Sequence, residues 1–134
     1  MGGEQPAGRK IQFQLASPLV FHSQGKSQPL PLPDLVFGSL LERWNAFAPV
    51  SFPAETRRYA AEMLAISRFD LSSRAIPLKS GGLRMGAVGQ VEFTALNADR
   101  YWLGILHTLA AFAQFAGLGA GTAQGLGQAR EICD

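Results

Sequence analysis

The chain has 134 residues, of which 47% are hydrophobic and 16% are charged. That size and apolar content are typical of one compact domain with its own core, which excludes a disordered chain and a multidomain assembly. Its 12 Lys and Arg residues against 10 Asp and Glu residues make it mildly basic, a balance that permits an anionic partner without requiring one.

The composition also limits location and cofactors. No apolar run reaches the ~18–20 residues that cross a bilayer, and no signal peptide is visible, so we expect a cytoplasmic protein that does not contact the membrane. The single Cys133 excludes an intramolecular disulfide, and two histidines are too few for a metal centre. We therefore expect no metal and no other cofactor.

The chain opens with a small, polar, Gly-rich segment. Residues 1–9 (MGGEQPAGR) predict a flexible lead-in, followed by a single domain over residues 10–134. The next residues, KIQFQL, alternate apolar and polar side chains, which is typical of a half-buried strand. We expect this strand to continue to Phe21, with Pro18 marking an edge position or a bulge.

Two helices are predicted after a proline-rich segment. Residues 22–33 (HSQGKSQPLPLP) are predicted as a loop, and Asp34 is placed to cap the helix that follows. In DLVFGSLLERWNAFA the apolar residues recur with the helical period and form one stripe. The segment ETRRYAAEMLA predicts a second, shorter helix.

The remaining elements are a hairpin, a helix and a final strand. The segments AISRFDLSSRAIPL and RMGAVGQVEFTAL alternate like strands on either side of a Gly-rich turn, and Phe69 is expected to pack under the helices. Residues 99–117 restore the helical period, from Asp99 near the start to Gly117 at the C-terminal cap. GLGQAREI predicts one last short strand.

The order of the main elements predicts the fold. Strand, helix, strand, strand, helix and strand in succession is the βαββαβ pattern of the ferredoxin-like fold. This α+β fold has a four-stranded antiparallel sheet with two helices on one face, and RNA-recognition domains share it.

Four segments together carry a family resemblance: SPLVF, PLPLPDLVFGSLLERWNAF, VGQVEF and FAGLGAGTAQGLGQAR. In this order the chain resembles the C-terminal domain of the CRISPR-associated repeat-RNA endoribonucleases of the Cas six type, which belong to the repeat-associated mysterious protein (RAMP) superfamily. The resemblance extends from about Ile11 to Ile132.

The resemblance implies a function in CRISPR antiviral defence. Such proteins pair two ferredoxin-like domains, bind the CRISPR repeat RNA and cut it without metal, leaving a 2′,3′-cyclic phosphate. The acid and base generally come from the N-terminal domain. We therefore expect an RNA-binding C-terminal half that does not cut RNA alone, with the repeat RNA, an N-terminal ferredoxin-like domain or other CRISPR-associated proteins as partners, and a homodimer as a further candidate.

The glycine-rich segment at residues 117–130 (GLGAGTAQGLGQAR) follows a helix, so it fits neither a Rossmann fingerprint nor a Walker loop. The resemblance implies that this loop lies beside the RNA. The alternative is that its glycines only cap the helix and form turns. On the RNA-binding interpretation, valine at Gly121 and Gly125 lowers RNA affinity and leaves the fold intact. The candidate contacts are Gly119, Gly121, Thr122, Gln124, Gly125, Gly127, Gln128 and Arg130.

The predicted hairpin is basic. It carries Arg68, Arg74, Lys79 and Arg84, four cations that are suited to contacting RNA phosphates. The alternative is a solvated hairpin whose charges serve only solubility.

Two further functions remain open beside the RNA-holding domain that the resemblance implies. His22, with Lys26 nearby, is the candidate catalytic pair of a complete minimal metal-independent endoribonuclease. The other is a docking module that contacts CRISPR proteins and no RNA.

Overall fold

The computed structural model of the chain describes residues 8–23 and 26–132, so Cys133 and most of the expected lead-in lie outside the described residues. The elements in chain order are β1 (Lys10–Leu19), β2 (Phe21–Ser23), β3 (Lys26–Gln28), α1 (Pro33–Phe47), α2 (Glu55–Met63), β4 (Leu64–Pro77), β5 (Leu83–Ala95), α3 (Arg100–Ala116), the short 3₁₀ helix η2 (Thr122–Gln124) and β6 (Ala129–Glu131).

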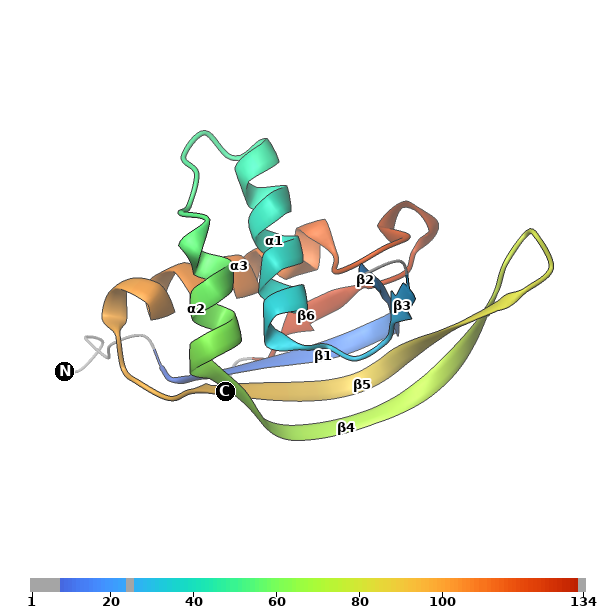
Figure 1. Cartoon of the computed structure of the whole chain (residues 1–134), viewed down its shortest axis with the longest axis horizontal. Coiled ribbons are helices and arrows are strands. Elements are labelled where there is room, and N and C mark those ends of the chain that lie inside the picture. The colour runs from blue at the N-terminus through green and yellow to red at the C-terminus, as the bar shows by residue number, and fades with distance from the viewer. Residues whose placement is uncertain (1–7, 24–25, 133–134) are drawn as a thin grey trace.

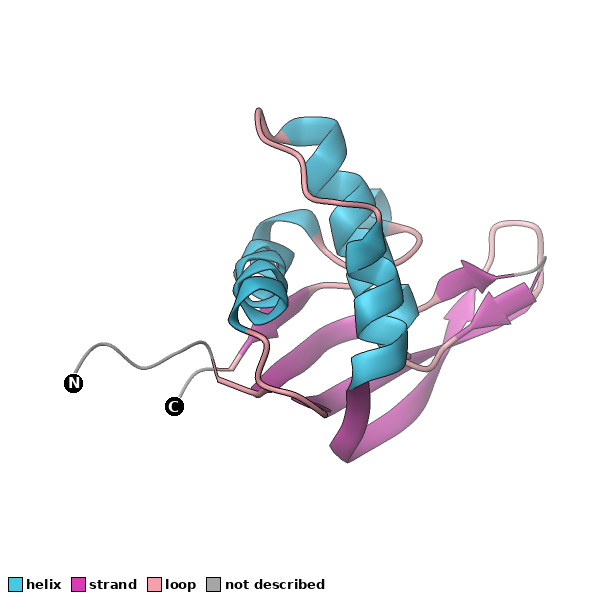
Figure 2. Ribbon diagram, turned by 60° about the vertical axis from the view of Figure 1, so that its left-hand side comes forward, coloured by secondary structure: helices cyan, strands magenta, loops and turns pink. Residues whose placement is uncertain are grey.

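The main sheet has the ferredoxin-like topology. Its strand order is β4-β5-β1-β6, and each neighbouring pair is antiparallel. The three helices lie on one face of this sheet, and the opposite face is uncovered (Figures 1 and 2). This confirms the predicted fold, with α2 as the shorter helix expected from ETRRYAAEMLA.

The core lies between the sheet and the helices. Alternate residues of β1 point into it. The rings of Phe13, Phe93 of β5 and Phe37 of α1 all contact one another, with centroids 5.9–6.2 Å apart. All three rings are fully buried. Phe69 was expected to join them but is 68% exposed, because β4 is the outermost strand and the helices do not cover it there.

The residues predicted at the N-terminal ends of the helices agree only partly with the structure. Asp99, which was predicted near the start of α3, caps this helix: its carboxylate accepts hydrogen bonds from the N–H groups of Tyr101 and Trp102 at 3.0 and 3.3 Å. The prediction for Asp34 is wrong. Pro33 opens α1, so Asp34 lies inside the first turn and its side chain makes no capping bond.

The segment predicted as a loop before α1 forms a small ribbon. Strands β2 and β3 pair antiparallel, with Phe21 opposite Gln28 and His22 opposite Ser27. These strands are only three residues long and, apart from Phe21, are polar, so no alternation marks them in the sequence. The register shift between Leu15 and Leu19 in β1 confirms the bulge expected near Pro18.

Candidate nucleic-acid interface

The glycine-rich loop joins α3 to β6 in a conformation that favours glycine. Five glycines have φ between 66° and 89°, the left-handed region that other residues rarely adopt. They are Gly117, Gly119, Gly121, Gly125 and Gly127.

Close packing explains two of these glycines directly. A Cβ at Gly119 would collide with the carbonyl oxygen of Val20, and one at Gly127 with the carbonyl oxygen of Leu118. N–H groups of the loop also donate hydrogen bonds to backbone carbonyls of residues 18 and 20. Gly127 N–H donates to the Pro18 carbonyl at 2.9 Å, and Ala120 N–H donates to the Val20 carbonyl at 2.8 Å. These two amides are therefore engaged within the protein and are not directed at an anion.

Valine at Gly121 and Gly125 was expected to leave the fold intact, but the backbone conformation of the loop is unfavourable for valine. Gly121 and Gly125 both have positive φ, and a Cβ at Gly121 would also press on the side chain of Leu126. Valine at either position therefore strains the fold.

Arg43 of α1 fixes the start of the loop. Its guanidinium donates hydrogen bonds to the carbonyls of Ala116 at 3.2 Å, of Gly117 at 2.6 Å, and of Gly119. Burial lowers the pKa of Arg43, while the negative charge of Glu42 acts in the opposite direction. The arginine places a positive charge at the negative end of the α3 dipole. Sequence reasoning missed this residue, because no local pattern links it to a loop about 75 positions away.

The polar residues of the loop divide between two places. Thr122, Gln128 and Arg130 line a hollow of about 470 Å³ beside the C-terminal end of α3. Arg130 Nη2 donates a 2.9 Å hydrogen bond to Gln14 Oε1, which holds it over β1. Gln124 is exposed and does not line the hollow. The structure therefore brings together three of the predicted side chains.

The β4–β5 hairpin presents its arginines on one face. Arg68 lies opposite Glu92, Arg74 opposite Gly86, and Ile76 opposite Arg84. Because alternate residues of a strand share a face, Arg68, Arg74 and Arg84 point to the same side. Lys79 lies in the exposed turn.

Positive charge on this face increases towards the hairpin tip. Near the base, Asp70 and Glu92 share the face with Arg68. Arg74 and Arg84 are diagonal neighbours in the half of the hairpin nearer its tip. The tip of the hairpin extends beyond the helices (Figure 1). We define Arg74, Lys79 and Arg84 as the basic tip.

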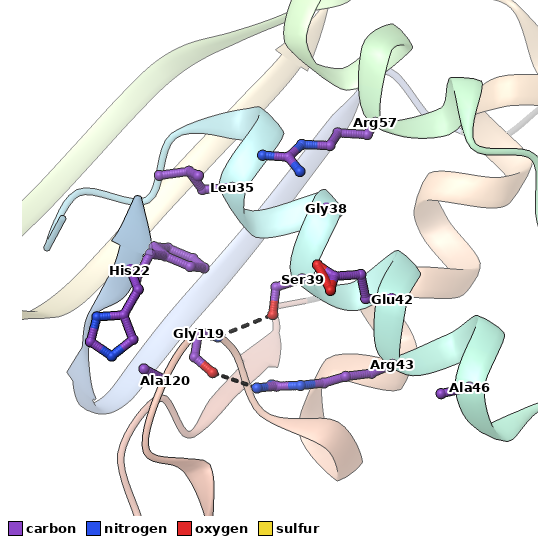
Figure 3. A pocket seen from close by; sticks show the side chains of 11 residues that line it. His22, Leu35, Gly38, Ser39, Glu42, Arg43, Ala46, Arg57, Gly119 and Ala120 are labelled. Atoms are coloured by element: carbon purple, nitrogen blue, oxygen red, sulfur yellow. Dashed lines mark hydrogen bonds between the residues drawn. The ribbon is translucent and has the colours of Figure 1, made fainter. Parts of the chain in front are cut away.

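The candidate catalytic pair is not assembled. Lys26 lies opposite Ser23 in the β2–β3 ribbon, and His22 lies opposite Ser27, so their side chains point to opposite faces. His22 instead lines a cleft of about 410 Å³ between β2 and α1 (Figure 3). Arg57 of α2 lines the same cleft.

Within the described ranges, no group of three or more His, Cys, Asp or Glu residues is arranged to hold a metal ion. No helix in that part of the chain is long and apolar enough to cross a membrane.

Comparisons with known proteins point to one family. Residues 13–129 match the family described as CRISPR-associated endoribonuclease Cas6. A Cas6 product complex and a Cas6 substrate mimic complex are each 32% identical, with TM-scores of 0.83 and 0.82. Thermus thermophilus Cas6 is 29% identical, with a TM-score of 0.86. These matches cover 96–97% of this chain and 55% of each Cas6, so the chain spans about half the length of the solved proteins. No curated protein matches the sequence.

Proposed function

Because the chain belongs to the CRISPR-associated endoribonuclease Cas6 family, we propose that it is the part of such an enzyme that holds the CRISPR repeat RNA. One observation carries this proposal. The chain superimposes over 97% of its length on 55% of a Cas6 solved as a product complex, at 32% identity. The family match over residues 13–129 includes the glycine-rich loop, up to Ala129, and the whole β4–β5 hairpin.

Electrostatic attraction to the RNA backbone supplies the binding. The basic tip presents three cations on a ribbon that extends from the domain, and each phosphate that a cation neutralises releases condensed counterions. The uncovered sheet face carries Gln12, Gln14 and Gln90 at central register positions, where a stacking RNA-recognition domain has aromatic residues. We therefore assign recognition to the shape and backbone of the RNA.

We assign the acid and base of cleavage to another part of the enzyme. In metal-independent cleavage a base removes the proton of the ribose 2′-hydroxyl, whose oxygen attacks the adjacent phosphate. The 5′-oxygen leaves with a proton from an acid, and a 2′,3′-cyclic phosphate remains. Because His22 and Lys26 point to opposite faces of their ribbon, we propose that an N-terminal ferredoxin-like domain supplies the acid and base.

A second candidate function has one observation in its favour. His22 and Arg57 line the same cleft, which offers a base and a cation to one phosphate (Figure 3). On this alternative the chain is a minimal ribonuclease that depends on His22.

Labelled repeat RNA distinguishes these functions. Binding and cleavage are measured in EDTA at several salt concentrations, with the wild-type chain and with His22→Ala. We expect salt-sensitive binding without cutting by either protein. Cutting that is lost in His22→Ala supports the minimal ribonuclease. Absence of binding at every salt concentration contradicts both and leaves the docking module.

A further inference from the structure

The cleft that contains His22 has walls from two separate parts of the fold. Helix α1 lines one wall with residues spaced at the helical period, among them Gly38, Ser39 and Glu42. His22 projects from the opposite wall, and Gly119 and Ala120 of the glycine-rich loop close one side (Figure 3). Its volume of about 410 Å³ lies in the range of ~300–1,000 Å³ that is typical of clefts for small ligands.

The side chain of Arg57 packs against α1 at the edge of this cleft. A Cβ at Gly38 would lie 2.9 Å from Nε of Arg57 and 3.0 Å from its Cδ, so the glycine leaves the space that this side chain occupies. Glycine inside a helix is unfavourable relative to alanine, and here it permits the arginine to approach the helix backbone. Arg57 reaches Asp34 only at 3.9 Å, and its side chain is 51% exposed. Its guanidinium therefore has donors available for another acceptor.

The polar groups of the cleft differ in charge along α1. Arg57 lies over Gly38, while Glu42 lies one turn further along the helix. Between them, Ser39 Oγ accepts a 3.2 Å hydrogen bond from Gly119 N–H, which leaves the hydroxyl hydrogen as a donor. A phosphate is attracted to Arg57 and repelled by the Glu42 carboxylate. A base amino group or a ribose hydroxyl is a suitable donor to Glu42.

We infer that this cleft binds one unpaired nucleotide of the RNA, with its phosphate at Arg57 and a base or ribose donor at Glu42. The inference rests on the proposed RNA-holding function and names a contact separate from the basic tip. His22, which is exposed, offers an imidazole ring for stacking on the base. Arg43 also lines the cleft beside Glu42, but its guanidinium is engaged with the carbonyls of Ala116, Gly117 and Gly119, so Arg57 is the cation assigned to the phosphate.

Two RNAs and one matched pair of variants test this inference. The first RNA is a fully paired repeat stem, and the second is the same stem with a single unpaired nucleotide at its end. Arg57→Gln removes the proposed phosphate contact. Arg58→Gln is the control, since it removes the same charge from the next residue of α2, which pairs with Glu62 at 3.1 Å and does not line the cleft.

We expect Arg57→Gln to lose about tenfold in affinity for the RNA with the unpaired nucleotide. Its affinity for the paired stem stays at the wild-type value, which also shows that the variant is folded. Arg58→Gln keeps wild-type affinity for both RNAs. Equal affinities of the two variants for the unpaired RNA overturn the inference, as does an equal loss by Arg57→Gln on both RNAs. If the wild type binds neither RNA, the proposed function fails together with the inference.

Discussion

The guanidinium of Arg43 donates a 2.6 Å hydrogen bond to the backbone carbonyl of Gly117, 74 residues further along the chain. The carbonyls at the end of α3 have no partners within the helix, and this arginine satisfies two of them together with the carbonyl of Gly119. Arg43 therefore links helix α1 to the glycine-rich loop, in addition to Ser39, whose Oγ accepts a 3.2 Å hydrogen bond from Gly119 N–H.

Arg43→Met is expected to lower the free energy of unfolding by about 2–3 kcal/mol, because partly buried carbonyls lose their donor. Arg43→Lys recovers only part of this stability, since an ammonium group lacks the planar fork that reaches three carbonyls. Denaturant unfolding measures both. The exposed Arg58→Gln serves as control and changes stability by less than about 1 kcal/mol. Equal stability of Arg43→Met and this control would show that the loop does not depend on the arginine.

Gly127→Ala is expected to destabilise the fold by more than about 3 kcal/mol, since its Cβ meets the Leu118 carbonyl at a φ of 66°. Gly82→Ala is the matched control. The nearest atom to its Cβ is Leu78 Cδ1 at 3.8 Å, an ordinary contact, so thermal unfolding of this variant stays close to wild type. Similar unfolding midpoints for the two variants would contradict the packing described for the loop.

Asp99→Ala removes the carboxylate that accepts hydrogen bonds from Tyr101 N–H and Trp102 N–H at the start of α3, and we expect a loss of about 1 kcal/mol. Asp34→Ala makes the same change in the first turn of α1, where the side chain forms no capping bond. Its effect is smaller, because only a dipole interaction and a 3.9 Å ion pair are removed. Urea titrations of both variants compare the two effects, and the opposite order would refute the assignment of the caps.

Stability is expected to fall at alkaline pH through Tyr59. Burial, and secondarily the negative charge of Asp99, raise the pKa of this phenol, which donates a 2.7 Å hydrogen bond to Asn97 Oδ1. The unfolded chain therefore loses this proton at a lower pH than the folded chain does. The stabilisation is complete below the unfolded pKa of about 10 and is lost as the pH rises through the higher folded value.

Tyr59→Phe tests this linkage, because it removes the titrating group. The decrease in unfolding free energy above about pH 10 becomes shallower in this variant than in wild type. Tyr101→Phe, at a residue that is 60% exposed, is the control and keeps the wild-type decrease. An unchanged alkaline decrease in Tyr59→Phe would exclude Tyr59 as its source.

The elements with a strong local pattern were predictable from sequence. The alternation of KIQFQL marks β1, and Asp99 and Gly117 mark the two ends of α3, because these signals depend only on neighbouring residues. The β2–β3 ribbon was missed since three residues per strand are too few to show a period. Phe69 was misplaced because alternation does not reveal that a strand lies at the edge of its sheet.

The candidate sites depended on contacts between distant residues and were predictable only in part. The four hairpin cations were visible as a cluster in the sequence, but their common face required the register of β4 against β5. The contacts of Arg43 with the glycine-rich loop, and the cleft shared by His22 and Arg57, join segments that have no sequence relation to one another. Their side chains meet only because the packing of the helices on the sheet brings these segments together.

The salt dependence of RNA binding tests the central claim most directly. Fluorescence anisotropy of a labelled repeat RNA, at several potassium chloride concentrations, compares wild type with the double variant Arg74→Gln, Arg84→Gln. We predict weaker binding and a plot of log affinity against log salt that is shallower by about two units, one for each arginine that no longer neutralises a phosphate. Arg100→Gln, which lies outside the basic tip, is the control: its slope of log affinity against log salt stays steeper than that of the double variant. An unchanged affinity and slope in the double variant would contradict the account of the β4–β5 hairpin as the RNA-holding element.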